Sequence, residues 1–480
     1  MADKLALRGP DFRALARTAA ELVASYYESL PDRPILEPTS SGALRNALRE
    51  PLPQEGAGFD TLAATVQDVL IRYTRHNGHP RFFGYVASPG TGVGAIGSMI
   101  EAALNANVTS WRSAPAPTEL EHVVIDWIKE MLGCPAEAAG LLVSGGSMAN
   151  FAGLAAARSF KAPEVTREGM PANGPRMRFY CSEEAHFSVQ KAAAMLGVGE
   201  SNVRAVPTDS RLRMDVSALD RAIAEDLAAG HLPACVVASL GTVGAGAVDP
   251  LPEIAAVAQR HGLWFHVDAA YGGFAALAPS ARGFFDGIGL ADSVALDPHK
   301  WLYLPAGCGC VLYKDPAAAR RAFAHGADYI NVIGHERDEA FAFWDYGPEL
   351  SRPFRALNLW LLVKYAGAQR LGEAIESNIR CAKKLEALVN ASDDFEMLAP
   401  VTLSIFCFRY APKNYAGDLD ALNERILIAL QRAGSSYVSN AKIRGQFALR
   451  GCVLNYRTTE RDMELLLEDV REAARKAAQE

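Results

Sequence analysis

The stretch LWFHVDAAYGG, residues 263–273, decides the fold class of this chain. It begins with a short apolar run rich in Trp, Phe and Val, residue types that are enriched in buried β-strands. Asp268 follows this run directly, and small residues and a glycine pair come next. Because open α/β sheets bind ligands at the carboxyl ends of their strands, the sequence predicts that Asp268 lies at such an edge.

Further apolar runs of similar length surround this one, and each is bounded by Gly, Pro or polar residues. They cover residues 140–143, 177–181, 234–240, 293–296 and 309–313, with helical stretches between them. Alternation of buried strands and helices is typical of a mostly parallel sheet that is covered on both faces. The predicted fold class is therefore α/β.

Two helices are predicted before this pattern, over residues 11–27 and 59–73, and a Pro-rich segment joins them. Their apolar residues recur at helical spacing. Two helices connected in this way cannot bury a core by themselves, so we expect them to pack on another surface, such as that of a partner subunit.

The C-terminal part has a different pattern. A long helical region, residues 357–388, leads into a strand at 402–409, another helix and a final strand–helix pair. These elements predict a small α+β domain. We therefore divide the chain into an N-terminal helical segment (1–80), a large α/β domain (81–365) and a small C-terminal α+β domain (366–480).

Composition excludes several classes of protein. A chain of 480 residues is too long for one hydrophobic core, and a net charge of −7 argues against nucleic-acid binding. The eight cysteines are scattered and the histidines lack ligand spacing, so neither a disulfide framework nor a metal site is predicted. Without a secretory signal or a membrane-length apolar run, we expect a soluble cytoplasmic protein.

Lys300 is the first candidate for chemistry, within SVALDPHKWLYLP, residues 293–305. Bulky apolar neighbours disfavour its ammonium form and make a free amine available for a Schiff base. Taken alone, such a lysine also fits a surface residue at a strand–loop junction.

Asp268 is the second candidate, because a buried carboxylate needs a cationic partner and a protonated pyridine nitrogen would be one. Ala270 and the glycine pair after it would let a flat ring approach closely. An ordinary turn aspartate is the alternative interpretation.

Two further motifs fit a phosphorylated planar cofactor. In LVSGGSMAN, residues 142–150, a strand enters the turn Gly145-Gly146-Ser147, which opens a helix and suits a phosphate. His186 follows the predicted strand 177–181 and could stack on a ring or transfer protons. A simple tight turn and a packed histidine are the alternatives. No G-x-G-x-x-G motif follows an early strand, which argues against a dinucleotide site.

Together these motifs resemble the group II pyridoxal-phosphate (PLP) dependent decarboxylases, and among them the aromatic-L-amino-acid decarboxylases. DPHKW, residues 297–301, is similar to the family's NPHKW, whose lysine forms the Schiff base with PLP. HVDAAY, residues 266–271, matches the pyridine-binding segment, and AHFS, residues 185–188, resembles the family's AHSS, whose histidine stacks on the cofactor. The segments 79–83 and 110–121 extend the likeness toward the N-terminus.

The resemblance implies a PLP-dependent transferase-like fold (fold type I) and a homodimer with active sites at the subunit interface. It implies catalytic roles for Lys300, His186 and Tyr329. The implied cofactor-binding residues are Gly145, Gly146, Ser147, His186, Thr242, Asp268, Ala270, His299 and Lys300. The implied substrate-binding residues are His79, Tyr85, Ser88 and Ser351.

Tyr329 matches a mobile-loop tyrosine that the family links to protonation of Cα, whereas phenylalanine there marks aldehyde-forming relatives. Tyrosine therefore favours simple decarboxylation, although a surface-loop tyrosine without chemistry is the alternative. Ser351 stands where some plant relatives use Ser or Gly to separate phenolic from indolic substrates, which hints at a phenolic side chain.

The sequence also departs from the animal enzymes. Asp297 replaces an asparagine near the phosphate, an unusual place for a negative charge unless it turns away, and Val243 replaces a threonine. Val86 replaces a pocket phenylalanine, and Asn77 a tryptophan. These changes leave the cofactor chemistry intact and the substrate side chain open.

The predicted activity is PLP-dependent decarboxylation of an aromatic L-amino acid of the tyrosine, dopa, tryptophan or phenylalanine type, giving the amine and CO2. The alternatives are an acidic amino acid substrate and oxidative decarboxylation to an aldehyde. A catalytically silent interaction protein is a third class, against which the intact set of Lys300, Asp268 and His186 argues.

Overall fold

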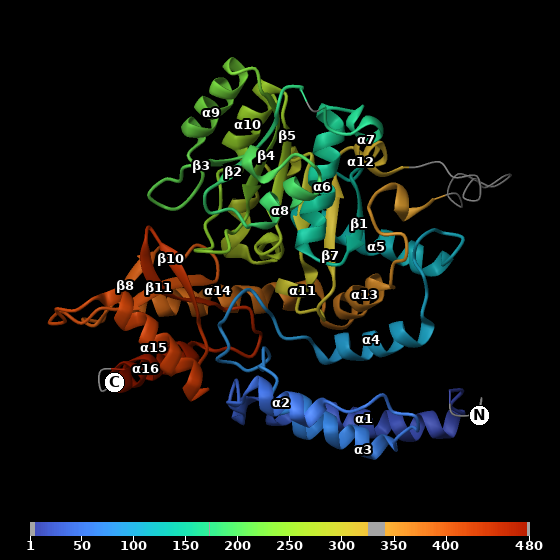
Figure 1. Cartoon of the computed structure of the whole chain (residues 1–480), viewed down its shortest axis with the longest axis vertical. Helices are drawn as coiled ribbons and strands as arrows, with labels where there is room; N and C mark the ends of the chain where they lie inside the picture. Colours follow the sequence, from blue (N-terminus) through green and yellow to red (C-terminus); the bar gives the residue numbers. More distant parts are fainter. Residues whose placement is uncertain (1–4, 172, 325–340, 478–480) are drawn as a thin grey trace.

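The computed structural model describes residues 5–171, 173–324 and 341–477. An α/β body surrounds one sheet, a smaller unit surrounds a second sheet, and a layer of N-terminal helices lies beneath them (Figure 1). This architecture confirms the predicted fold class.

The large sheet has seven strands in the order β1-β7-β6-β5-β4-β2-β3. Only β7 runs antiparallel to its neighbours, so the other strands end at the same edge of the sheet. The strands are β1 Ala139–Val143, β2 Met177–Ser182, β3 Val203–Val206, β4 Leu232–Ser239, β5 Trp264–Ala269, β6 Ser293–Leu296 and β7 Gly309–Tyr313.

Helices cover both faces of this sheet, and the strand order explains how. The connections β1–α6–β2 and β2–α8–β3 run one way along the sheet, whereas β3–α9–β4 and β4–α10–β5 run back. Right-handed crossovers therefore place α6 and α8 on one face and α9 and α10 on the other (Figure 1). The helices of this body are α4 Gly92–Leu104, α5 Pro115–Leu132, α6 Gly146–Lys161, α7 Val165–Glu168, α8 Ser188–Met195, α9 Val216–Ala228, α10 Leu251–His261, α11 Pro298–Trp301, α12 Pro316–Phe323 and α13 Arg355–Ala366.

The C-terminal unit has a four-stranded antiparallel sheet in the order β10-β11-β9-β8 and a hydrophobic core of its own. The predicted long helix is divided at Gly367, whose φ of +78° ends α13 before α14 begins. The predicted final strand is a hairpin, because Arg444 and Gly445 both take positive φ and turn the chain back. The elements are α14 Ala368–Asn390, β8 Phe395–Ala399, β9 Ile405–Tyr410, α15 Leu419–Ala433, β10 Ser439–Ile443, β11 Gln446–Cys452 and α16 Glu460–Ala477.

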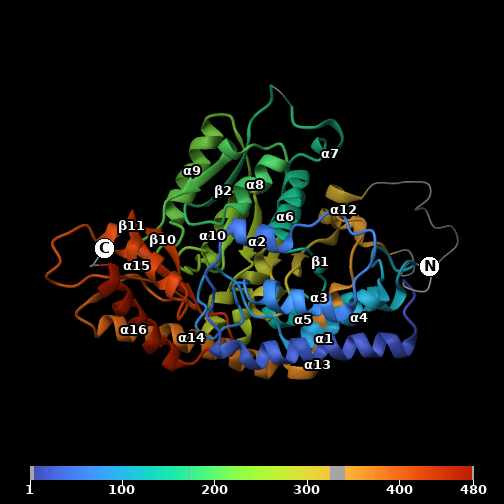
Figure 2. The same ribbon diagram turned by 60° about the horizontal axis from the view of Figure 1, so that its bottom comes forward.

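The N-terminal helices leave apolar side chains exposed. Helices α1 (Gly9–Ser29) and α3 (Phe59–Thr65) lie side by side near α4, and α2 (Ser41–Leu48) interrupts the Pro-rich connector (Figure 2). A π-helical turn, Val66–Ile71, extends α3. The exposed apolar residues include Phe12, Val23, Leu62, Leu70, Ile96, Met99 and Leu104. Among the described residues, none of the helices combines the length and the apolar character that crossing a membrane requires.

Candidate active site

A cavity of about 720 Å³ opens at the carboxyl edge of the large sheet, and residues of the β10–β11 hairpin complete its wall. All the predicted cofactor-binding residues line it, because they follow strands that end at this edge. They are Gly145, Gly146, Ser147, His186, Thr242, Asp268, Ala270, His299 and Lys300. Their binding roles stay predictions, but the structure brings them to one place.

The predicted substrate-binding residues are placed less uniformly. Tyr85 lines the cavity. Ser88 is not part of the cavity wall, and its hydroxyl donates a hydrogen bond of 2.8 Å to the His299 carbonyl. His79 is buried in the N-terminal layer, where Nε2 donates to the Pro31 carbonyl at 3.1 Å. Ser351 is exposed and lies outside the cavity wall. The chain therefore does not bring Ser88, His79 and Ser351 into this cavity, and Tyr329 lies outside the described residues.

The one-turn helix α11 positions Lys300 directly after β6. Its neighbour Trp301 is fully buried and stacks on Tyr271, with ring centroids 5.1 Å apart and an interplanar angle of 8°. The Trp301 indole also donates to Asn378 Oδ1 at 3.1 Å. Anchored in this way, α11 holds the Lys300 amine in the cavity, 2.9 Å from Oδ2 of Asp297.

The turn between β1 and α6 forms an anion cradle. Helix α6 begins at Gly146 without a side-chain cap, so its first N–H groups are available to an anion. The glycines are required by close approach: a Cβ on Gly146 would lie 2.8 Å from Cβ of Ala270, and one on Gly309 would lie 2.5 Å from Cα of Gly145. We call the Gly145–Ser147 turn the phosphate cradle.

Asn150 connects Asp268 to a buried histidine. Its amide nitrogen donates to Oδ2 of Asp268 at 2.8 Å, which leaves its amide oxygen 2.9 Å from Nε2 of His266. Since the amide oxygen can only accept, Nε2 of His266 carries the proton. Nδ1 of the same ring then accepts from the Ser293 hydroxyl at 2.7 Å, and burial lowers the pKa of His266 to about 4. His266 is therefore a neutral ring of known tautomer.

A second branch from Asn150 reaches His186. The amide nitrogen also donates to Oγ of Ser188 at 2.9 Å, so the Ser188 hydroxyl donates onward to Nδ1 of His186 at 2.8 Å. Burial lowers the pKa of His186, the charge of Lys300 lowers it further, and Asp268 opposes this effect. His186 is therefore neutral near pH 7 with its proton on Nε2, the ring nitrogen that remains for a ligand.

Arg450 is a site residue that the sequence analysis missed. It extends from β11 into the cavity wall, is only 3 % exposed, and donates to the carbonyls of Val243 (2.8 Å) and Tyr85. Within the described residues, the hydrogen bonds of this side chain go to these two carbonyls, and it forms no ion pair with a carboxylate. A buried guanidinium without a counter-ion suits an anionic ligand. A charged residue within the otherwise apolar strand FALRGC was the signal available in the sequence.

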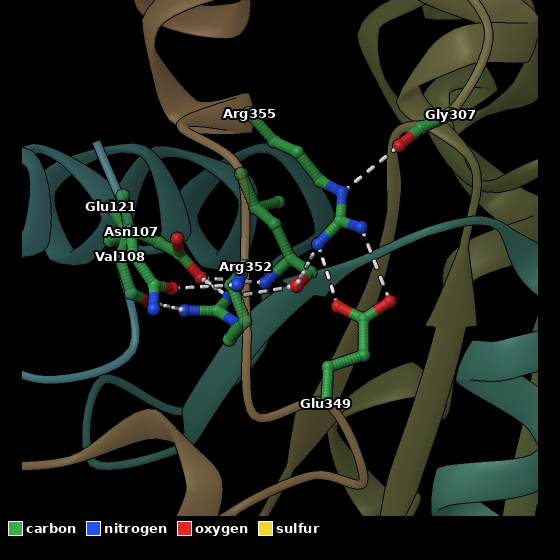
Figure 3. Close-up of polar contacts among 8 residues, drawn as sticks. Asn107, Val108, Glu121, Gly307, Glu349, Arg352 and Arg355 are labelled. Carbon is green, nitrogen blue, oxygen red and sulfur yellow. Dashed lines mark hydrogen bonds and ion pairs between the residues drawn. The ribbon is translucent and has the colours of Figure 1, made fainter. Parts of the chain in front are cut away.

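A buried ion pair, formed by Arg352 and Glu121, contacts the end of β1 that leads into the cradle (Figure 3). The side chains of Arg352 and Glu121 are both fully buried and contact each other. Arg352 donates to the Leu142 carbonyl at 2.8 Å, Glu121 accepts from the Leu142 N–H at 2.9 Å, and the guanidinium lies 4.1 Å from the Phe343 ring centroid. Nearby, Arg355 pairs with Glu349 at 2.7 Å (Figure 3). These contacts hold the end of β1, from which the cradle follows.

The cavity fits PLP. Asp268 is a buried carboxylate that has no cationic partner in the part of the chain that the structure describes, as a protonated pyridine would require. Lys300 offers an amine, the uncapped start of α6 suits a phosphate, and Ala270 leaves room for a flat ring. The described residues contain no cluster of three or more His, Cys, Asp or Glu side chains placed to hold a metal ion.

Comparison with known proteins agrees with this geometry. Residues 42–411 match the family model described as "Pyridoxal-dependent decarboxylase conserved domain". The chain is 33 % identical to an aromatic-L-amino-acid decarboxylase of Bacillus atrophaeus over 96 % of this chain and 95 % of that protein.

Solved structures share the fold over almost the whole chain. The structure of Oryza sativa TDC with PLP and tryptamine superposes with a TM-score of 0.92 at 28 % identity, covering 98 % of this chain and 99 % of that one. The glutamate decarboxylase domain of a Vibrio parahaemolyticus diaminobutyrate-pyruvate transaminase and L-2,4-diaminobutyrate decarboxylase reaches 0.86 at 27 % identity, covering 97 % and 96 %. With the cavity fitted to PLP and the family model spanning most of the sequence, the chain belongs to the pyridoxal-dependent decarboxylase family and is a PLP-dependent amino acid decarboxylase.

Proposed function

We propose that this enzyme decarboxylates an aromatic L-amino acid and releases the corresponding amine and CO2. The observation that carries the proposal is the charge pattern of the cavity wall. Among its described residues, Arg450 is the one guanidinium, and it has no carboxylate partner. An aromatic amino acid brings one carboxylate, whereas an acidic amino acid brings two and needs a second anion site.

The character of the remaining wall supports an apolar side chain. Tyr85, Phe187 and Val243 line the cavity and are 50 %, 66 % and 40 % exposed, so their apolar surfaces are available to a ligand. Aromatic rings bury large areas against such surfaces and pair favourably with other rings. The Bacillus relative acts on aromatic amino acids by its name, while the Vibrio structure carries names of other substrates.

Several residues of the cavity have a proposed task. Bound PLP supplies an electron sink for the bond between Cα and the carboxylate. Lys300 holds the cofactor, Asp268 keeps a proton on the pyridine nitrogen, and the cradle holds the phosphate. Arg450 binds the substrate carboxylate and fixes its direction relative to the ring plane, which selects the bond that breaks. His186 offers a hydrogen-bond donor, its Nε2–H, to the same substrate carboxylate.

The final proton reaches Cα from a side chain of this enzyme, and Tyr329 and His186 are the two candidates. Because a tyrosine at position 329 distinguishes amine-forming from aldehyde-forming members in the resemblance above, we propose amine as the main product. Oxidative decarboxylation to an aldehyde is the alternative.

We also propose that the enzyme is a homodimer with active sites near the subunit interface. The support is the apolar surface of α1, α3 and α4, where Phe12, Leu62 and Ile96 are 49 %, 50 % and 56 % exposed. A second copy that covered this surface would remove it from water. Sedimentation should give the mass of two chains, and a fully active monomer would refute the dimer.

The activity is tested with the holoenzyme and a panel of amino acids: tyrosine, dopa, tryptophan, phenylalanine, glutamate and 2,4-diaminobutyrate. Amine, CO2, aldehyde and hydrogen peroxide are measured for each. We expect amine and CO2 in equal amounts from at least one aromatic substrate and none from glutamate. Amine from glutamate alone would overturn the aromatic assignment, and aldehyde with peroxide as main products would overturn the reaction type.

A further inference from the structure

A buried carboxylate lies against the phosphate cradle. The Asp297 side chain is only 3 % exposed, and it faces the cavity instead of turning away from it. A Cβ built on Gly146 would lie 2.6 Å from Asp297 Oδ2, and one built on Gly145 would lie 3.7 Å from Oδ1. The two carboxylate oxygens therefore lie beside the glycine pair at which α6 begins.

Asp297 also holds the lysine of the site. Its Oδ2 forms an ion pair with Nζ of Lys300 at 2.9 Å. Its Oδ1 is buried and has no hydrogen-bond partner among the described residues. Nδ1 of His299 is 3.7 Å from Oδ1, but this nitrogen lies 2.8 Å from the Cys308 carbonyl, to which it donates. Within the described residues, Oδ2 of Asp297 thus has a cationic partner and Oδ1 has no hydrogen-bond partner.

We propose that the negative charge of Asp297 repels the phosphate of the cofactor. The enzyme therefore binds PLP less tightly than it would if the cradle had no carboxylate beside it. A phosphate at the start of α6 gains the N–H groups and dipole of the helix. The same phosphate meets a carboxylate in a cavity of low dielectric, where like charges repel strongly. The NPHKW sequence of the similar enzymes has an uncharged asparagine at this position, which can donate a hydrogen bond instead.

Two effects of Asp297 can be separated with two cofactor forms. Both PLP and pyridoxal carry the aldehyde that Lys300 must meet, so both require Lys300 to leave the ion pair with Asp297. Only PLP carries the phosphate that Asp297 repels. The ratio of the affinity for PLP to the affinity for pyridoxal therefore reports on the repulsion. If part of a variant sample is unfolded, both affinities are affected equally and the ratio does not change.

The test uses the full-length protein with its cofactor removed. Dissociation constants of PLP and of pyridoxal are measured from protein fluorescence and from the visible absorbance of bound cofactor. Asp297→Asn preserves the shape and removes the charge. We expect PLP to bind about tenfold more tightly to this variant, while pyridoxal gains much less. Asp297→Ser removes the same charge with a smaller side chain, and it should change the ratio in the same direction.

Glu184→Gln is the matched control, because it removes another carboxylate close to the cavity. Glu184 lies against Gly244 of the cavity wall and forms no ion pair with Lys300 in the described chain. We expect its PLP to pyridoxal ratio to equal that of the unmodified enzyme. Equal or weaker PLP binding in Asp297→Asn, or equal gains for PLP and pyridoxal, would overturn the proposal.

Discussion

The amide nitrogen of Asn150 lies 2.8 Å from Oδ2 of Asp268, and this contact determines the proton positions of two histidines. Because Asp268 accepts, the Asn150 oxygen must face His266, and its second N–H must face Ser188. The tautomers of His266 and His186 follow from that orientation. One side chain therefore contacts both the residue proposed to face the pyridine nitrogen, Asp268, and the hydroxyl that orients His186, the residue proposed to stack on the ring.

Replacing Asn150 by Ala should therefore affect both stability and cofactor binding. The variant leaves Oδ2 of Asp268 and the Nε2–H of His266 without their Asn150 partner in a buried site, and it removes one of the hydrogen bonds of the Ser188 hydroxyl. Each unsatisfied buried group costs about 1–3 kcal/mol. Urea unfolding of the cofactor-free protein and titration with PLP measure the two effects. Ser188→Ala is the control, because it keeps the Asn150–Asp268 contact; it should lose less stability. Equal losses in both variants would contradict the central position of Asn150.

Lys300→Ala should abolish the absorbance of covalently held cofactor and lower the rate of amine formation by about a thousandfold or more. The Lys300 amine is the group that we propose joins the cofactor and later releases the product. Visible spectra and amine assays check both effects. Retention of the spectrum in this variant would assign the cofactor to another lysine.

Replacing one member of the ion pair between Arg352 and Glu121 should destabilise the protein strongly, whereas replacing both members should destabilise it little. Arg352→Met leaves the Glu121 charge buried and unpaired, which costs about 3–5 kcal/mol. The double variant Arg352→Met, Glu121→Leu should be more stable than the single variant, because no charge remains. Chemical unfolding of the unmodified enzyme, of Arg352→Met, of Glu121→Leu and of the double variant gives the coupling free energy. If the double variant lost the sum of both single effects, the pair would carry no coupling.

The contribution of two buried histidines to stability should fall as the pH decreases from about 6.5 to about 4. Burial lowers the pKa values of His266 and His79 to about 4, whereas the unfolded chain has the ordinary value of about 6.5. Within this window each of the two histidines binds more protons in the unfolded state, so its contribution to the free energy of unfolding rises with pH, by up to about 3 kcal/mol per histidine. Asp249, whose pKa burial raises to about 6, acts in the opposite direction. His266→Gln keeps a donor toward Asn150 and removes the titration, so its slope should be shallower. An unchanged slope would assign the effect to other groups.

Arg450→Met should raise the KM of the substrate, because the guanidinium is proposed to bind its carboxylate. The loss in kcat/KM is expected to be about ten- to a hundredfold. The amine product lacks the carboxylate, so its inhibition constant should change little. That comparison distinguishes lost carboxylate binding from a damaged cavity. A parallel loss for substrate and product would contradict the assignment.

The sequence was most informative where local chemistry alone determines structure. The strands at 293–296 and 309–313 have the predicted bounds because each is a continuous apolar run between polar or glycine-rich turns. The members of the cavity at the strand ends were also predictable, since parallel strands bring their carboxyl ends to one edge. β3 was missed because its short sequence VRAV carries Arg204, which pairs with acidic residues of α9.

Other features depend on contacts between distant segments and left no local signal. His79 was expected at the substrate pocket, but the chain around it folds back to Pro31 and buries the ring in another layer. Arg450 enters the cavity only because the small sheet packs beside the large one. The direction of Asp297 likewise depends on Lys300 and on the glycine pair between β1 and α6, about 150 residues earlier in the chain.

The order of these segments along the chain has a consequence for synthesis on the ribosome. The cradle at residues 145–147 emerges early, yet its support Arg352 is 210 residues beyond Leu142, and Arg450 follows later still. A nascent chain folds in the order in which it emerges, and here the contact between Leu142 and Arg352 can form only after residue 352 has emerged. We therefore expect the cofactor to bind after the chain has been released, and we expect a chain truncated before residue 352 to contain the cradle motif but to retain PLP poorly.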